Sequence, residues 1–145
     1  MRFVTGGAYN GKKTWVKETF PERFESHFAW INCYETKNAD LADVTSVNAS
    51  TIVIEGVEEG LKEGILSKSV NGEAFFQAYL APLLEWEKEH EKRKVIMIGT
   101  DITKGIVPLD KELREWRDET GRLYQKLFRK ADHVHLIWFG IAETL

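Results

Sequence analysis

Glycine and lysine residues near the start of the sequence have the spacing of a loop that holds phosphate groups. Residues 6–12 read GGAYNGK, which fits the pattern G-x-x-x-x-G-K. Glycine adopts positive φ at no steric cost, so successive backbone N–H groups can face one anion. Lys12 adds a full positive charge that can reach the β- and γ-phosphates. This segment, the phosphate loop, predicts binding of ATP or GTP; the competing interpretation is an ordinary glycine-rich turn.

The residues that follow Lys12 depart from the complete pattern. The complete pattern has Ser or Thr directly after the lysine, where its hydroxyl binds Mg²⁺. Here Lys13 stands in that position and Thr14 follows it. An ammonium group cannot bind a metal, so either Thr14 or a water substitutes, metal binding is weakened, or nucleotide is held without efficient turnover. The predicted nucleotide site comprises Gly6, Gly7, Ala8, Tyr9, Asn10, Gly11, Lys12, Lys13 and Thr14.

Single acidic residues follow two apolar runs of the sequence. Glu55 follows TIVI and Asp101 follows KVIMIGT. In phosphate-loop proteins an acid at the end of a neighbouring buried strand holds Mg²⁺ directly or through water. We therefore predict that Glu55 and Thr14 bind Mg²⁺ and that Lys12 and Glu55 are catalytic, with Asp101 as an alternative acid. The competing interpretation is that these acids only cap strands or face solvent.

The histidines and the single cysteine form no recognisable catalytic arrangement. His133 and His135 alternate with apolar residues and share one face of an expected strand, but no third metal ligand is evident. His90 lies in a run of charges, and His27 begins a strand without a partner. Cys33 lies in an apolar strand and is predicted to be a small core residue.

Segments with strand and helix periodicity alternate along the chain. Runs rich in β-branched and aromatic residues predict strands at residues 2–5, 27–33, 51–54, 94–99 and 133–139. Amphipathic spacing predicts helices at residues 12–20, 73–93 and 110–130, a polar or helical piece at 58–69, and a loop with a helical turn at 35–50. Pro82 predicts a kink or restart, and Asp110 predicts an N-cap.

This alternation predicts an α/β fold. Strands that alternate with helices imply right-handed βαβ crossovers and parallel pairing. We expect a three-layer P-loop NTPase-like domain, in which a mainly parallel sheet lies between helices. No repeat, low-complexity tract or linker divides the sequence, so residues 1–145 are predicted to form a single nucleotide-binding domain.

Composition limits the partners and the compartment. Twenty basic and 23 acidic residues give a net charge of −3, which provides no general attraction for nucleic acid or an anionic membrane. No apolar stretch approaches the ~20 residues that span a bilayer, and no signal-peptide pattern is evident. A single cysteine is consistent with a reducing compartment. We predict a soluble cytoplasmic protein without nucleic-acid or membrane partners.

The carboxy-terminal part of the sequence resembles a known enzyme family. Residues 105–141 contain GIVP, then RxWRDxxGxxYQ, then ADxVxLxxxGI. These segments are similar to those of the bifunctional adenosylcobinamide kinase / adenosylcobinamide-phosphate guanylyltransferase family, with Tyr124 in place of the family's Asn. VTGGAYNGKK near the start resembles the family's VTGGAxSGKS loop. The resemblance covers residues 1–35 and 93–145, and between them only the TIVIEG strand.

The resemblance implies a phosphate-loop domain, often trimeric, that uses ATP or GTP. The family phosphorylates the aminopropanol hydroxyl of adenosylcobinamide and then transfers GMP onto that phosphate through a guanylyl-histidine. The reactive histidine of the family lies in a basic helical segment after the second strand. Residues 34–48, YETKNADLADVTSVN, contain neither histidine nor arginine. We therefore expect nucleotide binding without the guanylyl-histidine step.

Three functional hypotheses remain open at this point. The first is a shortened family member that retains kinase-type phosphoryl transfer to a cobinamide-like acceptor. The second is a non-catalytic nucleotide-binding or regulatory module, favoured by Lys13. The third is a structural subunit of a homo- or hetero-oligomer, in which Trp116 and the RxWRD segment contribute to an interface.

Overall fold

Five runs of β-branched and aromatic residues form parallel neighbours in one sheet. The structure is a computed structural model, and it describes residues 1–68 and 70–145. The parallel strands are β1 (Arg2–Gly6), β2 (Phe28–Asn32), β3 (Thr51–Glu55), β4 (Lys94–Thr100) and β5 (His133–Trp138). A sixth strand, β6 (Ile141–Thr144), runs antiparallel to β5, and the order across the sheet is β2-β3-β4-β1-β5-β6.

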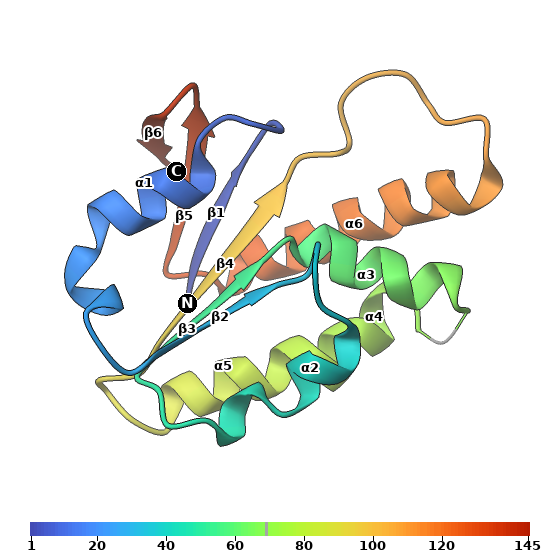
Figure 1. Ribbon diagram of the computed structural model, residues 1–145. Coiled ribbons are helices and arrows are strands. Elements are labelled where there is room, and N and C mark those ends of the chain that lie inside the picture. Colours follow the sequence, from blue (N-terminus) through green and yellow to red (C-terminus); the bar gives the residue numbers. More distant parts are fainter. Residues whose placement is uncertain (69) are drawn as a thin grey trace.

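Helices cover both faces of this sheet, as Figure 1 shows. One face carries α1 (Lys12–Thr19), which follows β1 directly. The other face carries the remaining helices: α2 (Asn38–Ala42), α3 (Val57–Leu66), α4 (Gly72–Phe75), α5 (Ala81–Lys88) and α6 (Lys111–Lys130). Short 3₁₀ turns at Pro21–Phe24 and Val44–Ser46 complete the connections. The prediction of a three-layer α/β domain with a mainly parallel sheet is confirmed.

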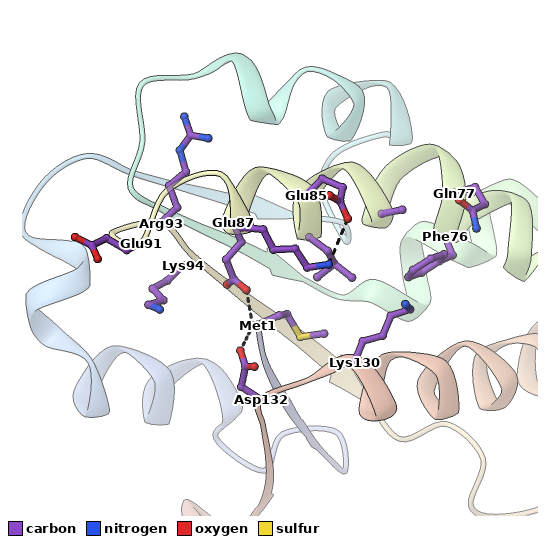
Figure 2. A pocket seen from close by; sticks show the side chains of 13 residues that line it. Met1, Phe76, Gln77, Glu85, Glu87, Glu91, Arg93, Lys94, Lys130 and Asp132 are labelled. Atoms are coloured by element: carbon purple, nitrogen blue, oxygen red, sulfur yellow. Dashed lines mark hydrogen bonds and ion pairs between the residues drawn. The ribbon is translucent and has the colours of Figure 1, made fainter.

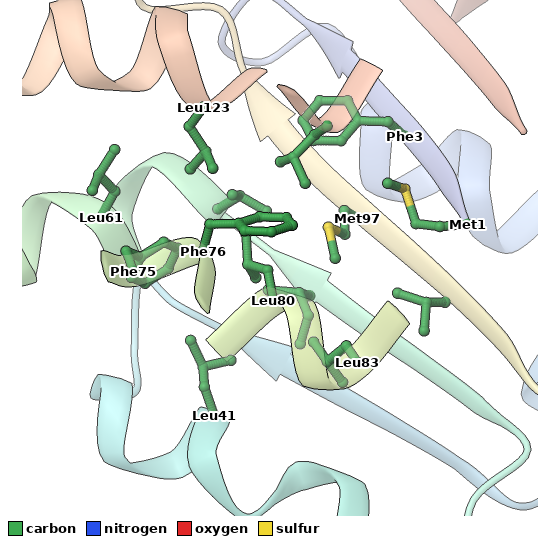
Figure 3. Packing of buried hydrophobic residues seen from close by; sticks show 14 of the residues in the cluster. Met1, Phe3, Leu41, Leu61, Phe75, Phe76, Leu80, Leu83, Met97 and Leu123 are labelled. Carbon is green, nitrogen blue, oxygen red and sulfur yellow. The ribbon is translucent and has the colours of Figure 1, made fainter. Parts of the chain in front are cut away.

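Hydrophobic side chains fill both interfaces between sheet and helices. Figure 3 shows the larger cluster, in which Phe3 and Met97 from the sheet meet Leu80 and Leu83 from the covering helices. The smaller cluster, under α1, consists of Val4, Val16, Val53, Ile96, Ile98 and Ile137. Because strands β1, β3 and β4 are covered on both faces, their sequences read as nearly continuous apolar runs.

The helix predicted at residues 73–93 is interrupted, as predicted, and ends earlier than predicted. It contains a π-helical turn at Phe76–Leu80, followed by α5 with Pro82 in its first turn. Proline lacks the N–H that an uninterrupted helix needs. The new start of α5 at Ala81, next to Pro82, confirms the predicted kink or restart. The helix ends at Lys88 rather than at Arg93, because the backbone N–H of Arg93 closes a turn on the carbonyl of His90 before β4 begins.

Other predicted elements agree with the structure apart from their ends and one addition. Asp110 caps α6 by accepting hydrogen bonds from the N–H groups of Glu112 and Leu113, as predicted. The segment predicted at 58–69 forms α3, and its last residue, Ser69, lies outside the described residues. Strand β6 was not predicted, because four residues after a turn carry little periodicity. Within the described residues, no helix is long and apolar enough to cross a membrane.

His135 fastens the unpredicted strand β6 to the sheet. Arg2 Nη1 lies 3.2 Å from His135 Nε2, and His135 Nδ1 lies 3.0 Å from Thr144 Oγ1. Arginine has no acceptor, so Nε2 accepts and the proton of the neutral ring is on Nδ1, which donates to Thr144. Burial lowers the pKa of His135, and the charges of Arg2 and His133 lower it further. The ring of His133 is stacked on that of His135, with the ring centres 6.1 Å apart.

The lowered pKa of His135 makes the stability of the fold depend on pH. Between its folded pKa and its ordinary value near 6.5, the unfolded chain binds more protons than the folded chain. The stability that neutral His135 contributes is therefore present above about pH 6.5 and is lost as the pH falls. We expect the melting temperature to drop from pH ~7.5 to pH ~5.5 by more in the wild type than in His135→Asn, measured by thermal unfolding. Equal pH slopes in the two proteins would contradict this role.

Candidate nucleotide-binding site

The phosphate loop turns sharply between β1 and α1. Gly6 has φ 148°, Tyr9 has φ 57° and Gly11 has φ 87°. A Cβ atom on Gly6 would lie 2.2 Å from the carbonyl oxygen of Ile137 on β5, so the close approach of β5 requires glycine there. The N–H of Asn10 closes the turn on the carbonyl of Gly7 at 3.4 Å. The loop is thus a tight strand-to-helix connection, as the glycine spacing predicts.

Lys12 folds back over the loop that precedes it. Its Nζ donates to the carbonyl of Gly7 at 2.6 Å and to that of Gly6 at 3.4 Å. Burial lowers the pKa of Lys12, and the carboxylates of Glu58 and Glu55 oppose that shift. Loop carbonyls therefore hold the ammonium group, and the two carboxylates attract it electrostatically. Its position suits contact with an anion that enters the loop.

The turn between β5 and β6 supports the loop from the side. The N–H of Gly140 donates to the carbonyl of Asn10 at 2.8 Å, and Asn10 Nδ2 reaches the carbonyl of Ile137 at 3.5 Å. Phe139 and Gly140 both have positive φ, which a two-residue hairpin turn requires. The carboxy-terminal segment therefore fixes the backbone of a loop that lies more than a hundred residues earlier.

A cleft of about 630 Å³ opens beside the loop, at the carboxyl ends of the strands. Open α/β sheets bind ligands at this edge. The predicted residues Ala8 to Thr14 and Glu55 all line the cleft, while Gly6 and Gly7 lie behind Lys12 and hold it. The other lining residues are Tyr34, Gly56, Glu58, Glu59, Ile98, Thr100 and Ile102. The predicted site residues are thus brought together around one opening.

Glu55 lies at the end of β3, as predicted, and its carboxylate is engaged by neighbouring side chains. Trp30 Nε1 donates to Glu55 Oε2 at 2.7 Å, and Lys13 Nζ lies 3.2 Å from the same oxygen. Lys13 also lies 5.4 Å from the centre of the Trp30 ring, in cation–π range. The residue that replaces the usual hydroxyl and the predicted metal-binding acid therefore form an ion pair with each other.

Asp101 has a different role from Glu55. Its Oδ1 accepts hydrogen bonds from the N–H and the hydroxyl of Thr103, and its Oδ2 lies 3.7 Å from Lys104 Nζ. Its own N–H donates to the carbonyl of Gly6 at 3.0 Å. Asp101 therefore shapes the start of the connection to α6 and ties it to the phosphate loop.

Glu58 is a site residue that the sequence did not predict. It lies in the first turn of α3 and is only 1% exposed. Its carboxylate accepts hydrogen bonds from the hydroxyl of Tyr34, from the hydroxyl of Tyr124 at 3.0 Å and from the N–H of Thr100 at 3.0 Å. Burial and the charge of Glu58 raise the pKa of both tyrosines. The tyrosines therefore keep their protons and donate them in hydrogen bonds to Glu58.

Helix α6 contacts Glu58 through two aromatic side chains, Trp116 and Tyr124. Trp116 Nε1 donates to the backbone carbonyl of Glu58 at 2.7 Å, and Arg114 Nη1 donates to the carbonyl of Pro108 at 3.1 Å. Within this segment, Trp116 thus contacts α3 and Arg114 contacts the connection before α6. In the sequence, Glu58 is one of two adjacent glutamates on a polar helix, and only the tertiary contacts distinguish it from Glu59.

The histidines lie away from the cleft in the described part of the chain. His27, His90 and His133 precede strands β2, β4 and β5 or begin them, at the opposite edge of the sheet. His135 lies within β5 and contacts Arg2 and Thr144. Cys33 is partly buried, and burial together with the charge of Glu58 raises its pKa to about 12, so the thiol stays protonated.

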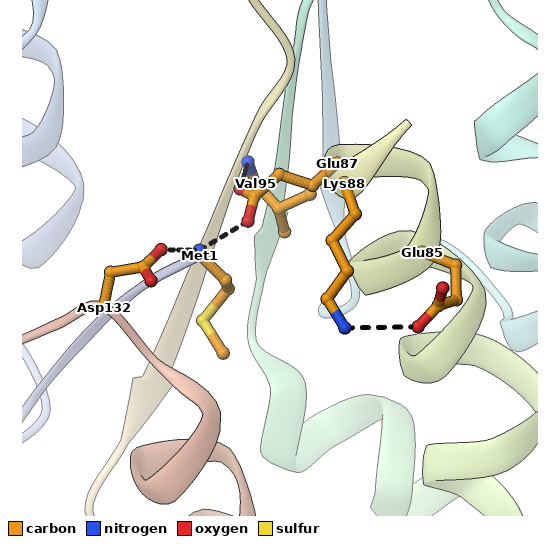
Figure 4. A network of polar contacts seen from close by, with 6 residues as sticks. All are labelled: Met1, Glu85, Glu87, Lys88, Val95 and Asp132. Carbon is orange, nitrogen blue, oxygen red and sulfur yellow. Dashed lines mark hydrogen bonds and ion pairs between the residues drawn. The ribbon is translucent and has the colours of Figure 1, made fainter. Parts of the chain in front are cut away.

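A second cavity, of about 730 Å³, lies at that opposite edge (Figure 2). It is lined by acidic and basic residues of α5, with Met1, Lys130 and Asp132. Figure 4 shows how they satisfy one another: the amino group of Met1 donates to Glu87 and Asp132, and Glu87 also accepts from the N–H of Val95. Because these groups are paired and the amino ends of the strands lie here, the smaller cleft beside the phosphate loop is the candidate site.

The buried contacts of Glu58 predict a loss of stability on substitution. Glu58→Leu preserves bulk but leaves the N–H of Thr100 without its acceptor, which costs about 1–3 kcal/mol. The matched control is Glu59→Leu, which removes only a long contact to Lys62 and is expected to cost about 0.5 kcal/mol or less. Urea unfolding measures the free energy of unfolding of both variants. Equal losses would show that the hydrogen bonds of Glu58 stabilise the fold no more than the side chain of Glu59 does.

One comparison with known proteins places the chain in a family. A family model described as cobinamide kinase / cobinamide phosphate guanyltransferase matches residues 21–145. The match begins after the phosphate loop, so it is independent of the segment that first indicated nucleotide binding. No curated protein matches the chain. Since the match covers most of the sequence, the chain belongs to the cobinamide kinase / cobinamide phosphate guanyltransferase family, a nucleotide-using family of cobalamin biosynthesis.

Proposed function

We propose that this protein binds ATP or GTP in the cleft beside the phosphate loop and transfers a phosphoryl group to a cobinamide-like acceptor. One observation carries this proposal: the Lys12 ammonium folds over the carbonyls of Gly6 and Gly7 at the mouth of a 630 Å³ cleft. The loop geometry and the family membership support it independently, because the family match excludes residues 1–20.

The proposed chemistry is mainly positioning and electrostatics, as in phosphoryl transfer generally. Backbone N–H groups of the loop and the first turn of α1 hold the phosphates, and Lys12 neutralises charge that develops on the transferred group. The sequence predicts Glu55 and Thr14 as Mg²⁺ ligands, but Oε2 of Glu55 is paired with Lys13 and also accepts from Trp30. Glu58 keeps Tyr34 and Thr100 in place at the floor of the cleft.

The guanylyl-histidine step has no supporting residue in the described cleft. Residues 34–48, which follow β2, include the short helix α2 and contain no histidine. The four histidines of the chain lie at the opposite edge of the sheet or within β5. We therefore propose kinase-type chemistry without transfer of GMP.

A second candidate function is nucleotide binding without catalysis. The ion pair between Lys13 and Glu55 favours it, since it occupies the acid that would hold a catalytic metal. This candidate differs from the first only in turnover. The trimeric assembly and cytoplasmic location inferred from the sequence stay predictions.

Substitution of Lys12 tests nucleotide binding. Lys12→Ala removes the charge that lies over the loop, and we expect the dissociation constant for ATP and GTP to rise at least about tenfold by calorimetry. Lys17→Ala, on the same helix, is the matched control and is expected to bind as the wild type does. Unchanged affinity in Lys12→Ala would refute the proposed site.

Mass spectrometry separates the two half-reactions of the family. With ATP or GTP and cobinamide, we expect cobinamide phosphate to form, and to be absent with Lys12→Ala. With GTP alone, we expect the intact protein to gain no GMP adduct, because no histidine is placed at the cleft. A stable adduct would contradict the second expectation, and nucleotide binding without cobinamide phosphate would favour the non-catalytic candidate.

A further inference from the structure

We propose that Lys13 takes the place of the metal ion in this site, so that the protein binds the triphosphate in its metal-free form. This inference rests on the proposed nucleotide binding and deepens it by naming the form of the ligand. Lys13 follows Lys12 at the position where a metal-binding hydroxyl is usual.

Two contacts hold the Lys13 ammonium beside the acid that would bind the metal. Lys13 Nζ lies 3.2 Å from Glu55 Oε2 and 5.4 Å from the centre of the Trp30 ring. Trp30 Nε1 donates to the same carboxylate oxygen at 2.7 Å. The Glu55 side chain is only 15% exposed, whereas Lys13 is 47% exposed. A fixed, partly buried acid thus positions a cation that remains accessible from the cleft.

The surrounding groups do not fit a resident Mg²⁺ ion. Mg²⁺ requires near-octahedral oxygen ligands at about 2.0–2.1 Å. Glu55 shares its Oε2 with an ammonium and an indole N–H, and both oxygens of Glu58 already accept hydrogen bonds. Among the described residues, no group of three or more His, Cys, Asp or Glu side chains is arranged to hold a metal. A divalent cation would also meet the positive charges of Lys12 and Lys13.

The same charges suit a metal-free triphosphate. Such a ligand carries more negative charge than its Mg²⁺ complex, and two lysines with the amino end of α1 provide the compensation. Lysine has a flexible stem and three donors, so Lys13 can turn from Glu55 toward a phosphate oxygen without moving the backbone. In the absence of ligand, Glu55 keeps the Lys13 ammonium positioned beside the cleft.

Lys17 provides a matched control for this role. It is one helical turn further along α1, and its Nζ lies 5.3 Å from the centre of the same Trp30 ring. It has the same charge as Lys13 but is not among the residues that line the cleft in the described part of the chain. Replacing either lysine by threonine changes the net charge equally.

The test is calorimetric titration of the whole chain with ATP, GTP and inorganic triphosphate, in EDTA and in excess MgCl₂. Excess MgCl₂ converts nearly all of the triphosphate to its Mg²⁺ complex, so we expect the wild type to bind at least about tenfold more weakly in MgCl₂ than in EDTA. In Lys13→Thr, affinity in EDTA should fall at least about tenfold and recover in part with MgCl₂, because a hydroxyl replaces the ammonium. Lys17→Thr should behave as the wild type does.

The outcomes separate this inference from the proposed function. Wild-type binding that is as tight in MgCl₂ as in EDTA, or tighter, would overturn the role of Lys13 and leave nucleotide binding intact. No binding in either buffer would refute the proposed function, and this inference with it. Lys13→Thr with wild-type affinity in EDTA would also overturn the inference. Thermal unfolding checks that each variant is folded.

Glu55→Gln gives an independent measurement if Lys13→Thr does not fold. The amide keeps an oxygen acceptor for Trp30 but removes the charge that holds Lys13. Metal-free triphosphate should then bind at least about threefold more tightly than to the wild type. Weaker binding in EDTA would mean that Glu55 does not compete with phosphate for Lys13, and the inference would fail.

Discussion

The buried carboxylate of Glu58 is the interaction on which the candidate site depends. A buried charge is tolerated only when hydrogen bonds replace the water it has lost. Tyr34, Tyr124 and the N–H of Thr100 provide those bonds, and they come from the segment after β2, from α6 and from the end of β4. Satisfying one charge therefore fixes the relative positions of the elements that surround the cleft.

Around that fixed acid, the site balances its own charges. Lys12 donates to a loop carbonyl and interacts electrostatically with Glu58 and Glu55. Lys13 forms an ion pair with Glu55. In the proposed binding mode, an anionic ligand competes with the Glu55 carboxylate for Lys13. We therefore propose that the identity of the residue after Lys12 affects which form of the ligand binds.

Much of the fold and part of the site follow from local sequence. Glycine spacing between a strand and a helix predicted the phosphate loop, and Asp110 predicted the start of α6, because backbone conformation and capping depend on neighbouring residues. The position of Glu55 followed from the end of an apolar run. Strand β6 and the end of α5 were missed, since a short edge strand and a turn depend on contacts such as those of His135 and Arg93.

The sequence by itself determined the alternating α/β architecture, the phosphate loop and the family resemblance, because periodicity and motif spacing are written along the chain. Only the tertiary structure decided which acidic residues are buried and which side chains each of them contacts. Glu58 and Glu59 are adjacent and chemically identical, yet only Glu58 is buried, and its backbone carbonyl accepts a hydrogen bond from Trp116 of α6. Glu55 and Asp101 both follow strands, but Glu55 lies beside Lys13 while Asp101 lies beside Thr103, because side-chain partners are set by packing across the sheet.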